Sequence, residues 1–139
     1  MKYLYTSPLF VGAVLAIALS SCKNVVGPST GAGIFFPDTG TISYSRYVQP
    51  LFDQTCATYD CHDQATGNNG NLDLTDQNSY FSLTGTGYIN TRGDTTHCIL
   101  LQAIKGQLTP RMPLPPYPRL TPNQISGITR WVAQGAKYN

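Results

Sequence analysis

Apolar residues recur at helical spacing in four stretches of the chain between residue 44 and residue 139. Spacings of three and four residues place such side chains on one face of a helix, whereas a half-buried strand would alternate them. The predicted helices are Arg46–Thr55, Asp76–Leu83, His97–Lys105 and a closing helix from Pro122 to Gly135. No convincing pair of strands lies between them, so we expect an all-α fold of about four short helices joined by long loops.

The closing helix has the clearest boundaries. Thr121 is a good N-cap, Pro122 suits the first helical position and Gln124 completes a capping box. Gly135 fits the C-terminal stop. The apolar face of this helix consists of Ile125, Ile128, Trp131 and Val132.

The other helices carry shorter apolar stripes. We expect Ser45 to cap the first helix and Pro50 to bend or delay it. The residues expected to face inward are Tyr47, Val48, Leu51 and Phe52 in the first helix, Tyr80, Phe81 and Leu83 in the second, and Leu100, Leu101 and Ile104 in the third. Residues Thr109–Pro118 contain five prolines, so this segment cannot be a helix and is predicted to be extended.

The first 43 residues differ in character from the rest. Lys2, the short apolar run Leu9–Leu19 and the small residues before Cys22 are typical of a secretory signal peptide, too short for a spanning helix. A cysteine directly after those residues resembles a bacterial lipoprotein signal. Residues 1–21 would then be the signal and Cys22 the lipidated first residue, although an ordinary signal peptide with an incidental cysteine is the alternative.

The change in composition also predicts where a tether ends and a folded domain begins. Residues 22–43 are rich in Gly, Ser, Thr and Pro and are predicted to be a flexible tether, with Ile34–Phe36 as an exception that could dock onto the domain. Residues 44–139 have the size of one small domain. The sequence has nine Lys and Arg residues, seven Asp and no Glu. A net charge this close to balance gives no reason to expect nucleic-acid binding.

The segment Cys56-Ala-Thr-Tyr-Asp-Cys61-His62 carries the strongest chemical signal. Covalent attachment of a haem needs two thiols for the two vinyl groups and a histidine next to the second thiol to bind iron, usually as C-x-x-C-H. Here four residues separate the cysteines, so the two added residues must bulge out.

Two other uses of the same residues remain open. Cys56 and Cys61 could form a disulfide, as exported cysteines often do. A structural zinc site could instead use the three cysteines with one histidine, and it would account for the odd residue Cys98. Its ligands would be Cys56, Cys61, Cys98 and either His62 or His97.

The order of motifs resembles the small single-haem c-type cytochrome domains of bacterial envelope lipoproteins. The matching segments are Val48-Gln-Pro50-Leu51-Phe52, the cysteine–histidine segment, Gly70-Asn-Leu72-Asp-Leu74, Leu100-Leu101 with Ile104–Gly106, Met112-Pro113 and Leu120–Ala136. The resemblance implies a cytochrome c-like fold around one covalent haem c, held by Cys56 and Cys61. It implies His62 as the proximal iron ligand and Met112 as the second axial ligand, with His97 as a substitute if Met112 does not bind.

Further roles follow from that resemblance. Trp131, Tyr80, Phe81 and Leu101 could pack against the macrocycle, although Trp131 suits the core as well. Either Arg111 or Arg119 could pair with the haem propionates. The implied protein is an electron carrier and not an enzyme, anchored by lipid to a membrane of the bacterial cell envelope, facing the periplasm or the exterior, with redox proteins as partners and no nucleic acid. The alternative is an envelope binding module without haem, stabilised by zinc or a disulfide.

Overall fold

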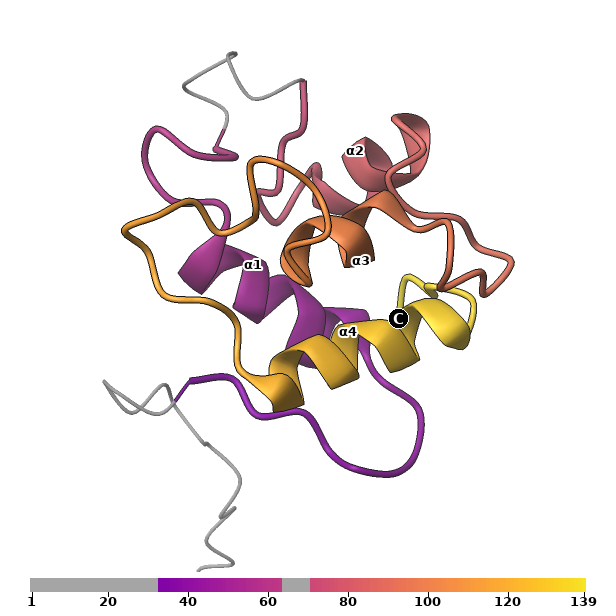
Figure 1. Ribbon diagram of the computed structural model, residues 1–139. Coiled ribbons are helices and arrows are strands. Elements are labelled where there is room, and N and C mark those ends of the chain that lie inside the picture. The colour runs from indigo at the N-terminus through magenta and orange to yellow at the C-terminus, as the bar shows by residue number, and fades with distance from the viewer. Residues whose placement is uncertain (1–32, 64–70) are drawn as a thin grey trace, which may run out of the picture. The chain divides into compact units, whose positions relative to one another are not determined.

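The computed structural model describes residues 33–63 and 71–139 (Figure 1). These described residues belong to one compact unit. The predicted signal peptide and Cys22 lie outside the described residues, as does the part of the predicted tether before Gly33.

Every regular element of the described residues is a helix, which confirms the predicted all-α class. The elements are η1 (Tyr44–Val48), α1 (Gln49–Thr55), α2 (Ser79–Gly85), α3 (Ile99–Ile104) and α4 (Pro122–Ala133). Over the same residues, none of the helices has the length and apolar character needed to cross a bilayer.

The first helix starts two residues before its predicted boundary. Its cap is Ser43 rather than Ser45, and the Ser43 hydroxyl accepts a hydrogen bond from the Arg46 amide at 3.3 Å. Residues 44–48 form a π-turn, and α1 begins at Gln49 with Pro50 in its first turn. A proline has no amide hydrogen to donate, and the change from the π-turn to the α-helix falls directly before Pro50.

The second and third helices are both shorter than predicted. Asp73 accepts hydrogen bonds from the Thr75 amide at 2.9 Å and the Asn78 side chain at 2.8 Å, which holds the chain in a turn until α2 starts. Phe81 was expected to face inward, but it is 66% exposed and packs edge-to-face on Tyr80. A helix of only two turns cannot bury both Leu83 and Phe81, which lie two positions apart on different faces.

The closing helix matches its prediction most closely. Thr121 and Gln124 form both hydrogen bonds of the capping box, and Gly135 ends the helix with a φ of 90°. Ile128, Trp131 and Val132 are buried, while Ile125 is half-buried. The proline-rich segment before the helix is not helical, as predicted, but it bends instead of extending throughout, because the Tyr117 amide donates to the Leu114 carbonyl at 2.9 Å.

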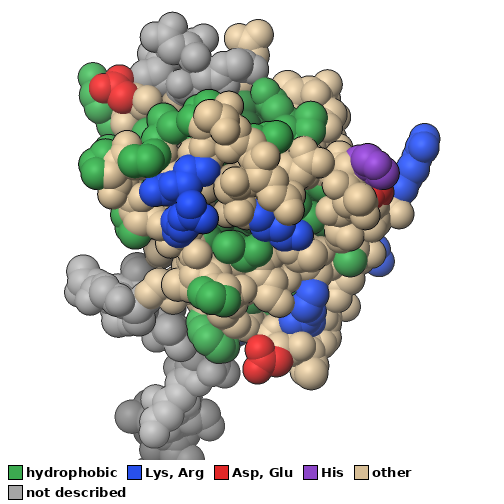
Figure 2. Space-filling view, viewed as in Figure 1, with side chains coloured by type: hydrophobic (Ala, Val, Ile, Leu, Met, Phe, Trp, Pro, Cys, Tyr) green, Lys and Arg blue, Asp and Glu red, His purple; other side chains and the backbone are tan. Residues whose placement is uncertain are grey.

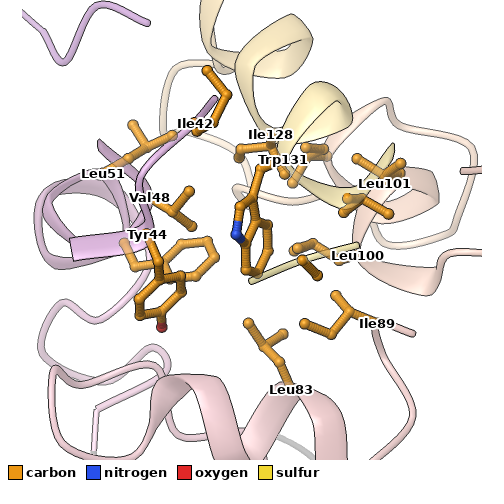
Figure 3. Packing of buried hydrophobic residues seen from close by; sticks show 14 of the residues in the cluster. Ile42, Tyr44, Val48, Leu51, Leu83, Ile89, Leu100, Leu101, Ile128 and Trp131 are labelled. Carbon is orange, nitrogen blue, oxygen red and sulfur yellow. The ribbon is translucent and has the colours of Figure 1, made fainter. Parts of the chain in front are cut away.

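Trp131 lies at the centre of the core (Figure 3). Its ring centroid is 5.3 Å from that of Tyr44, and its indole N–H donates to the Lys137 carbonyl at 3.0 Å. Four leucines and one isoleucine of α1, α2 and α3 belong to the same buried cluster, namely Leu51, Leu83, Leu100, Leu101 and Ile104. The core is therefore built from side chains of all the helices.

Residues 34–42, here called the N-terminal strap, run along α4 in the same direction (Figure 1). Asn123 brackets Phe36, since its side chain accepts from the Phe36 amide at 2.8 Å and donates to the Phe36 carbonyl at 2.9 Å. Farther along, the Gln134 side chain accepts from the Ile42 amide at 2.8 Å. Phe36 and Ile42 are buried, so the segment expected to dock does so, and the packed unit begins before residue 44.

Candidate functional site: the Cys56–His62 turn

The end of α1 delivers the chain into a tight turn of residues 56–62, here called the motif turn. The amides of Cys56 and Ala57 both donate to the Phe52 carbonyl at 2.8 Å. The His62 amide then donates to the Cys56 carbonyl at 3.0 Å. The first cysteine and the histidine of the motif are thus adjacent in space as well as close in sequence.

The two residues that lengthen the motif form a bulge, as predicted. The Cys61 amide donates to the Thr58 carbonyl at 2.9 Å, which closes a turn over Tyr59 and Asp60. Both of these residues are exposed, and Asp60 has a φ of 61° in the left-handed region. The turn absorbs the added length while Cys56 and His62 stay joined through their backbone.

The imidazole of His62 is oriented by the segment 72–74. Its Nδ1 lies 3.2 Å from the Leu72 carbonyl oxygen, and because a carbonyl only accepts, Nδ1 is the protonated nitrogen. The Leu74 amide donates to the His62 carbonyl at 2.8 Å, so ring and backbone are held from the same side. The remaining nitrogen, Nε2, then carries a lone pair, which is the arrangement that orients a histidine for metal binding.

Burial favours the neutral form of that imidazole. It lowers the pKa of His62 below its ordinary value, and the hydrogen bond to Leu72 offsets only part of the shift. A neutral imidazole is the form that binds iron. His62 therefore has both the protonation state and the tautomer that the sequence motif requires.

A buried polar network holds the segment 72–74 against the first helix. The Gln49 side chain donates to the Leu74 carbonyl at 3.1 Å and to Asp53 at 2.8 Å, and its oxygen accepts from the Tyr44 hydroxyl at 2.8 Å. Ser79, at the start of α2, also contacts Gln49 and Tyr44 through hydrogen bonds. Burial raises the pKa of the Tyr44 hydroxyl to about 12, so it remains a donor.

The thiols of Cys56 and Cys98 are enclosed to different degrees. Burial raises the pKa of Cys56 to about 11, with a smaller lowering by the Thr55 hydroxyl and a further rise from neighbouring Cys61. Cys56 is half-buried and is not in a disulfide. Cys98 is a buried thiol whose sulfur lies 3.5 Å from the Tyr88 carbonyl.

The five candidate zinc ligands all fall within the described ranges. There, no three side chains of His, Cys, Asp or Glu lie close enough together to hold one metal ion. His97 is 82% exposed and pairs with Asp94 at 2.9 Å, so its side chain points away from the core. The tetrahedral zinc site is therefore not assembled in this structure.

Met112 is half-buried and is positioned from α3, because its amide donates to the Ala103 carbonyl at 3.1 Å. The guanidinium of Arg111 donates to the carbonyls of Pro113 and Tyr117, which fixes the loop around Met112. Arg119 is exposed, and its guanidinium lies over Gly106.

The aromatic candidates separate into two groups. Trp131, like Leu101, is fully enclosed in the core, in keeping with a core role. Tyr80 is half-buried and meets the ring of Tyr44 edge-to-face and the ring of Tyr138 at a tilt, with ring centroids 5.5 Å and 4.8 Å away.

No motif in the sequence predicts the support behind His62. The Leu72 carbonyl and the Gln49 side chain come from segments before and after the motif turn, and no spacing rule connects them to it. The signal that the sequence offered for Gln49 was its position as a polar residue between Val48 and Leu51, which are both buried. Comparisons of the chain with models of protein families, with curated proteins and with solved structures gave no match.

Proposed function

We propose that this protein is an electron carrier that holds one haem c at the motif turn. The observation that carries the proposal is the state of His62, whose Nδ1 donates to the Leu72 carbonyl and whose Nε2 is left with its lone pair. An incidental histidine after a structural cysteine would need neither this tautomer nor a lowered pKa.

The two cysteines would hold the haem by thioether bonds on the same turn as its iron ligand. Haem bound there would supply one-electron chemistry through its iron. Cys56 is a neutral thiol and not part of a disulfide, so its sulfur is available for such a bond. The bulge at Tyr59 and Asp60 reconciles the longer motif with the short backbone distance between Cys56 and His62.

Met112 is the proposed second axial ligand. A thioether favours the reduced metal and so raises the reduction potential. The loop that carries Met112 is tied to α3 and to the Arg111 guanidinium, so its sulfur is held within a fixed backbone. Little rearrangement of the chain would then accompany each transfer of an electron.

The helix order supports a cytochrome c-like fold for residues 44–139, with a middle helix, a proline-stiffened methionine loop and a closing helix after the motif turn. We propose the same role and location as the resemblance implies. The protein would be anchored through Cys22 to a bacterial envelope membrane and would exchange electrons with protein partners there, without an enzymatic reaction of its own and without binding nucleic acid.

The test is a pyridine haemochrome spectrum and an intact mass of protein made in cells that attach haem c. We expect a c-type spectrum and one added haem mass that reduction does not remove. The double variant Cys56→Ala with Cys61→Ala should lose the added mass, whereas the matched control Cys98→Ala should keep it. A colourless wild-type preparation from a competent host would refute the proposal.

A second measurement tests the axial pair. His62→Ala should abolish the low-spin spectrum, and Met112→Ala should lower the reduction potential and change the spectrum. Leu114→Ala removes an exposed apolar side chain from the same loop and should leave both unchanged. An unchanged spectrum in Met112→Ala would exclude Met112 as the ligand without affecting the assignment of the cysteines.

A further inference from the structure

Residues 105–119, here called the proline loop, expose three apolar side chains, here called its apolar centre, and cationic side chains at the two ends of the loop. Leu108, Leu114 and Tyr117 are exposed, and the Tyr117 side chain reaches 53%. Lys105 and Arg119 are exposed at the two ends of the loop. Figure 2 shows Lys and Arg side chains beside hydrophobic ones on the side where Figure 1 draws this loop.

Acidic residues are missing from the whole C-terminal part of the sequence. All seven aspartates occur at or before Asp94, whereas Lys105, Arg111, Arg119, Arg130 and Lys137 follow it. The cations of the proline loop therefore have no carboxylate side chain from their own part of the chain to neutralise them. Such a surface attracts a negatively charged binding partner.

The loop is already fixed in the free protein. Hydrogen bonds join Met112 to Ala103 and Tyr117 to Leu114, and the Arg111 guanidinium bridges the carbonyls of Pro113 and Tyr117. The prolines restrict the backbone further. A partner that docks here would spend little free energy on ordering the loop.

We propose that the proline loop is the docking surface for a partner protein whose contact face is acidic around an apolar centre. Tyrosine and arginine at an exposed apolar centre with a polar rim are the composition of protein interfaces. An anionic membrane is disfavoured, because recognition of anionic lipids usually takes clusters of about four to eight Lys and Arg residues. Arg111 is moreover engaged by loop carbonyls, which leaves Lys105 and Arg119 as the outward charges.

The position of Met112 within the same loop gives the docking a consequence for electron exchange. A partner seated on Leu114 and Tyr117 would lie next to the residue proposed as an iron ligand, which would shorten the path between the two redox centres. This consequence rests on the proposed function, whereas the docking itself requires no haem.

The experiment is an NMR titration of ¹⁵N-labelled protein with a capped ten-residue peptide that alternates Glu with Phe and Leu. The same peptide with Lys in place of Glu is the control ligand, and vesicles of phosphatidylglycerol are the control for lipid. We expect shifts centred on residues 105–119 with the Glu peptide, weakening with salt, and no shifts there with the Lys peptide. Because the titration follows amide signals, it gives an answer for protein with or without haem.

Variants separate this surface from a general effect of charge. Lys105→Glu together with Arg119→Glu should lower affinity at least about tenfold. The single variant Lys105→Glu covers the case in which loss of Arg119 disturbs the loop. Arg92→Glu changes the net charge by the same amount as the single variant Lys105→Glu, at an exposed site outside the loop, and should lower affinity by less than about twofold at physiological salt.

The apolar centre is tested by Tyr117→Ser, which should lower affinity about fivefold without changing the salt dependence. Equal losses in Lys105→Glu and Arg92→Glu would overturn the proposal, because net charge alone would then explain binding. Binding to the vesicles but not to the Glu peptide would overturn it in favour of a membrane surface. Chemical-shift changes confined to residues outside 105–119 would also overturn the proposal, because the peptide would then bind elsewhere.

Discussion

Gly127 lies on the face of α4 that meets the ring of Phe36, and a methyl group added there would overlap that ring. The bracket of hydrogen bonds from Asn123 holds the Phe36 backbone at this position. The ring can therefore avoid the methyl group only by leaving its buried site. Gly127→Ala is expected to undock Phe36 from α4.

The magnitude follows from two opposing terms. Phe36 is 1% exposed, and loss of a buried phenylalanine side chain costs about 3–5 kcal/mol. Alanine in a helix interior is favoured over glycine by about 1 kcal/mol. Gly127→Ala should thus lower the free energy of unfolding by about 2–4 kcal/mol. In a Phe36→Gly background both the ring and the Phe36 Cβ, which would lie 2.5 Å from the added methyl group, are gone, and the same substitution should raise the free energy of unfolding by up to about 1 kcal/mol.

Urea unfolding followed by the fluorescence of buried Trp131 measures both values. Gly85→Ala is the matched control, since it lies in α2 with nothing near the added methyl group, and it should not destabilise. If Gly127→Ala costs the same with and without the Phe36 ring, the packing of the strap on α4 described above is incorrect.

Three further substitutions or measurements test the motif turn and its support. Gln49→Leu should lower the free energy of unfolding by about 1–3 kcal/mol, because it leaves the buried hydrogen-bond partners of Gln49 unsatisfied. The control Gln54→Leu, at an exposed position, should change the free energy of unfolding by less than about 0.5 kcal/mol. Equal effects of the two substitutions would rule out the network. Since burial lowers the folded pKa of His62, the unfolded chain takes up its proton first as the pH falls from about 7, so stability should decline through the unfolded pKa towards the folded one. His62→Asn, which does not titrate, should remove that part of the decline in pH-dependent urea titrations, and an unchanged slope would contradict the assignment. Cys56, with its pKa raised to about 11, should react with iodoacetamide at pH 8 at least about tenfold more slowly in folded than in urea-unfolded protein, as read by peptide mass spectrometry; equal rates would contradict its burial.

The sequence predicted those elements whose signals are local. The capping box of Thr121 and Gln124, the stop at Gly135 and the apolar face of α4 depend on residues within one helix, and all three are observed. The exposure of Phe81 was predicted incorrectly, because a helix of two turns does not bury both Phe81 and Leu83. The start of α2 was predicted incorrectly, because Asp73 and its partners hold the preceding turn. Side chains of that kind compete with helix formation in a way that periodicity does not register.

The candidate site likewise combines residues predicted from local signals with residues brought in by tertiary contacts. The spacing of Cys56, Cys61 and His62 already predicted a bulged turn, because those residues are only a few positions apart. The carbonyl of Leu72 and the side chain of Gln49 reach the site through tertiary contacts, which no motif in the chain encodes. Residues of that kind emerge only from the folded arrangement.

The strap along α4 has a mechanical consequence. Its hydrogen bonds to α4 begin at Ile34 and continue to Ile42, in the order in which the chain passes them. Tension applied to the chain before residue 33 would act first on the hydrogen bond at Ile34. The hydrogen bonds of the strap to α4 would then break one after another before the force acted on η1. The turn that carries Cys56 and His62 lies beyond that point, so the strap isolates it from pulling on the preceding chain.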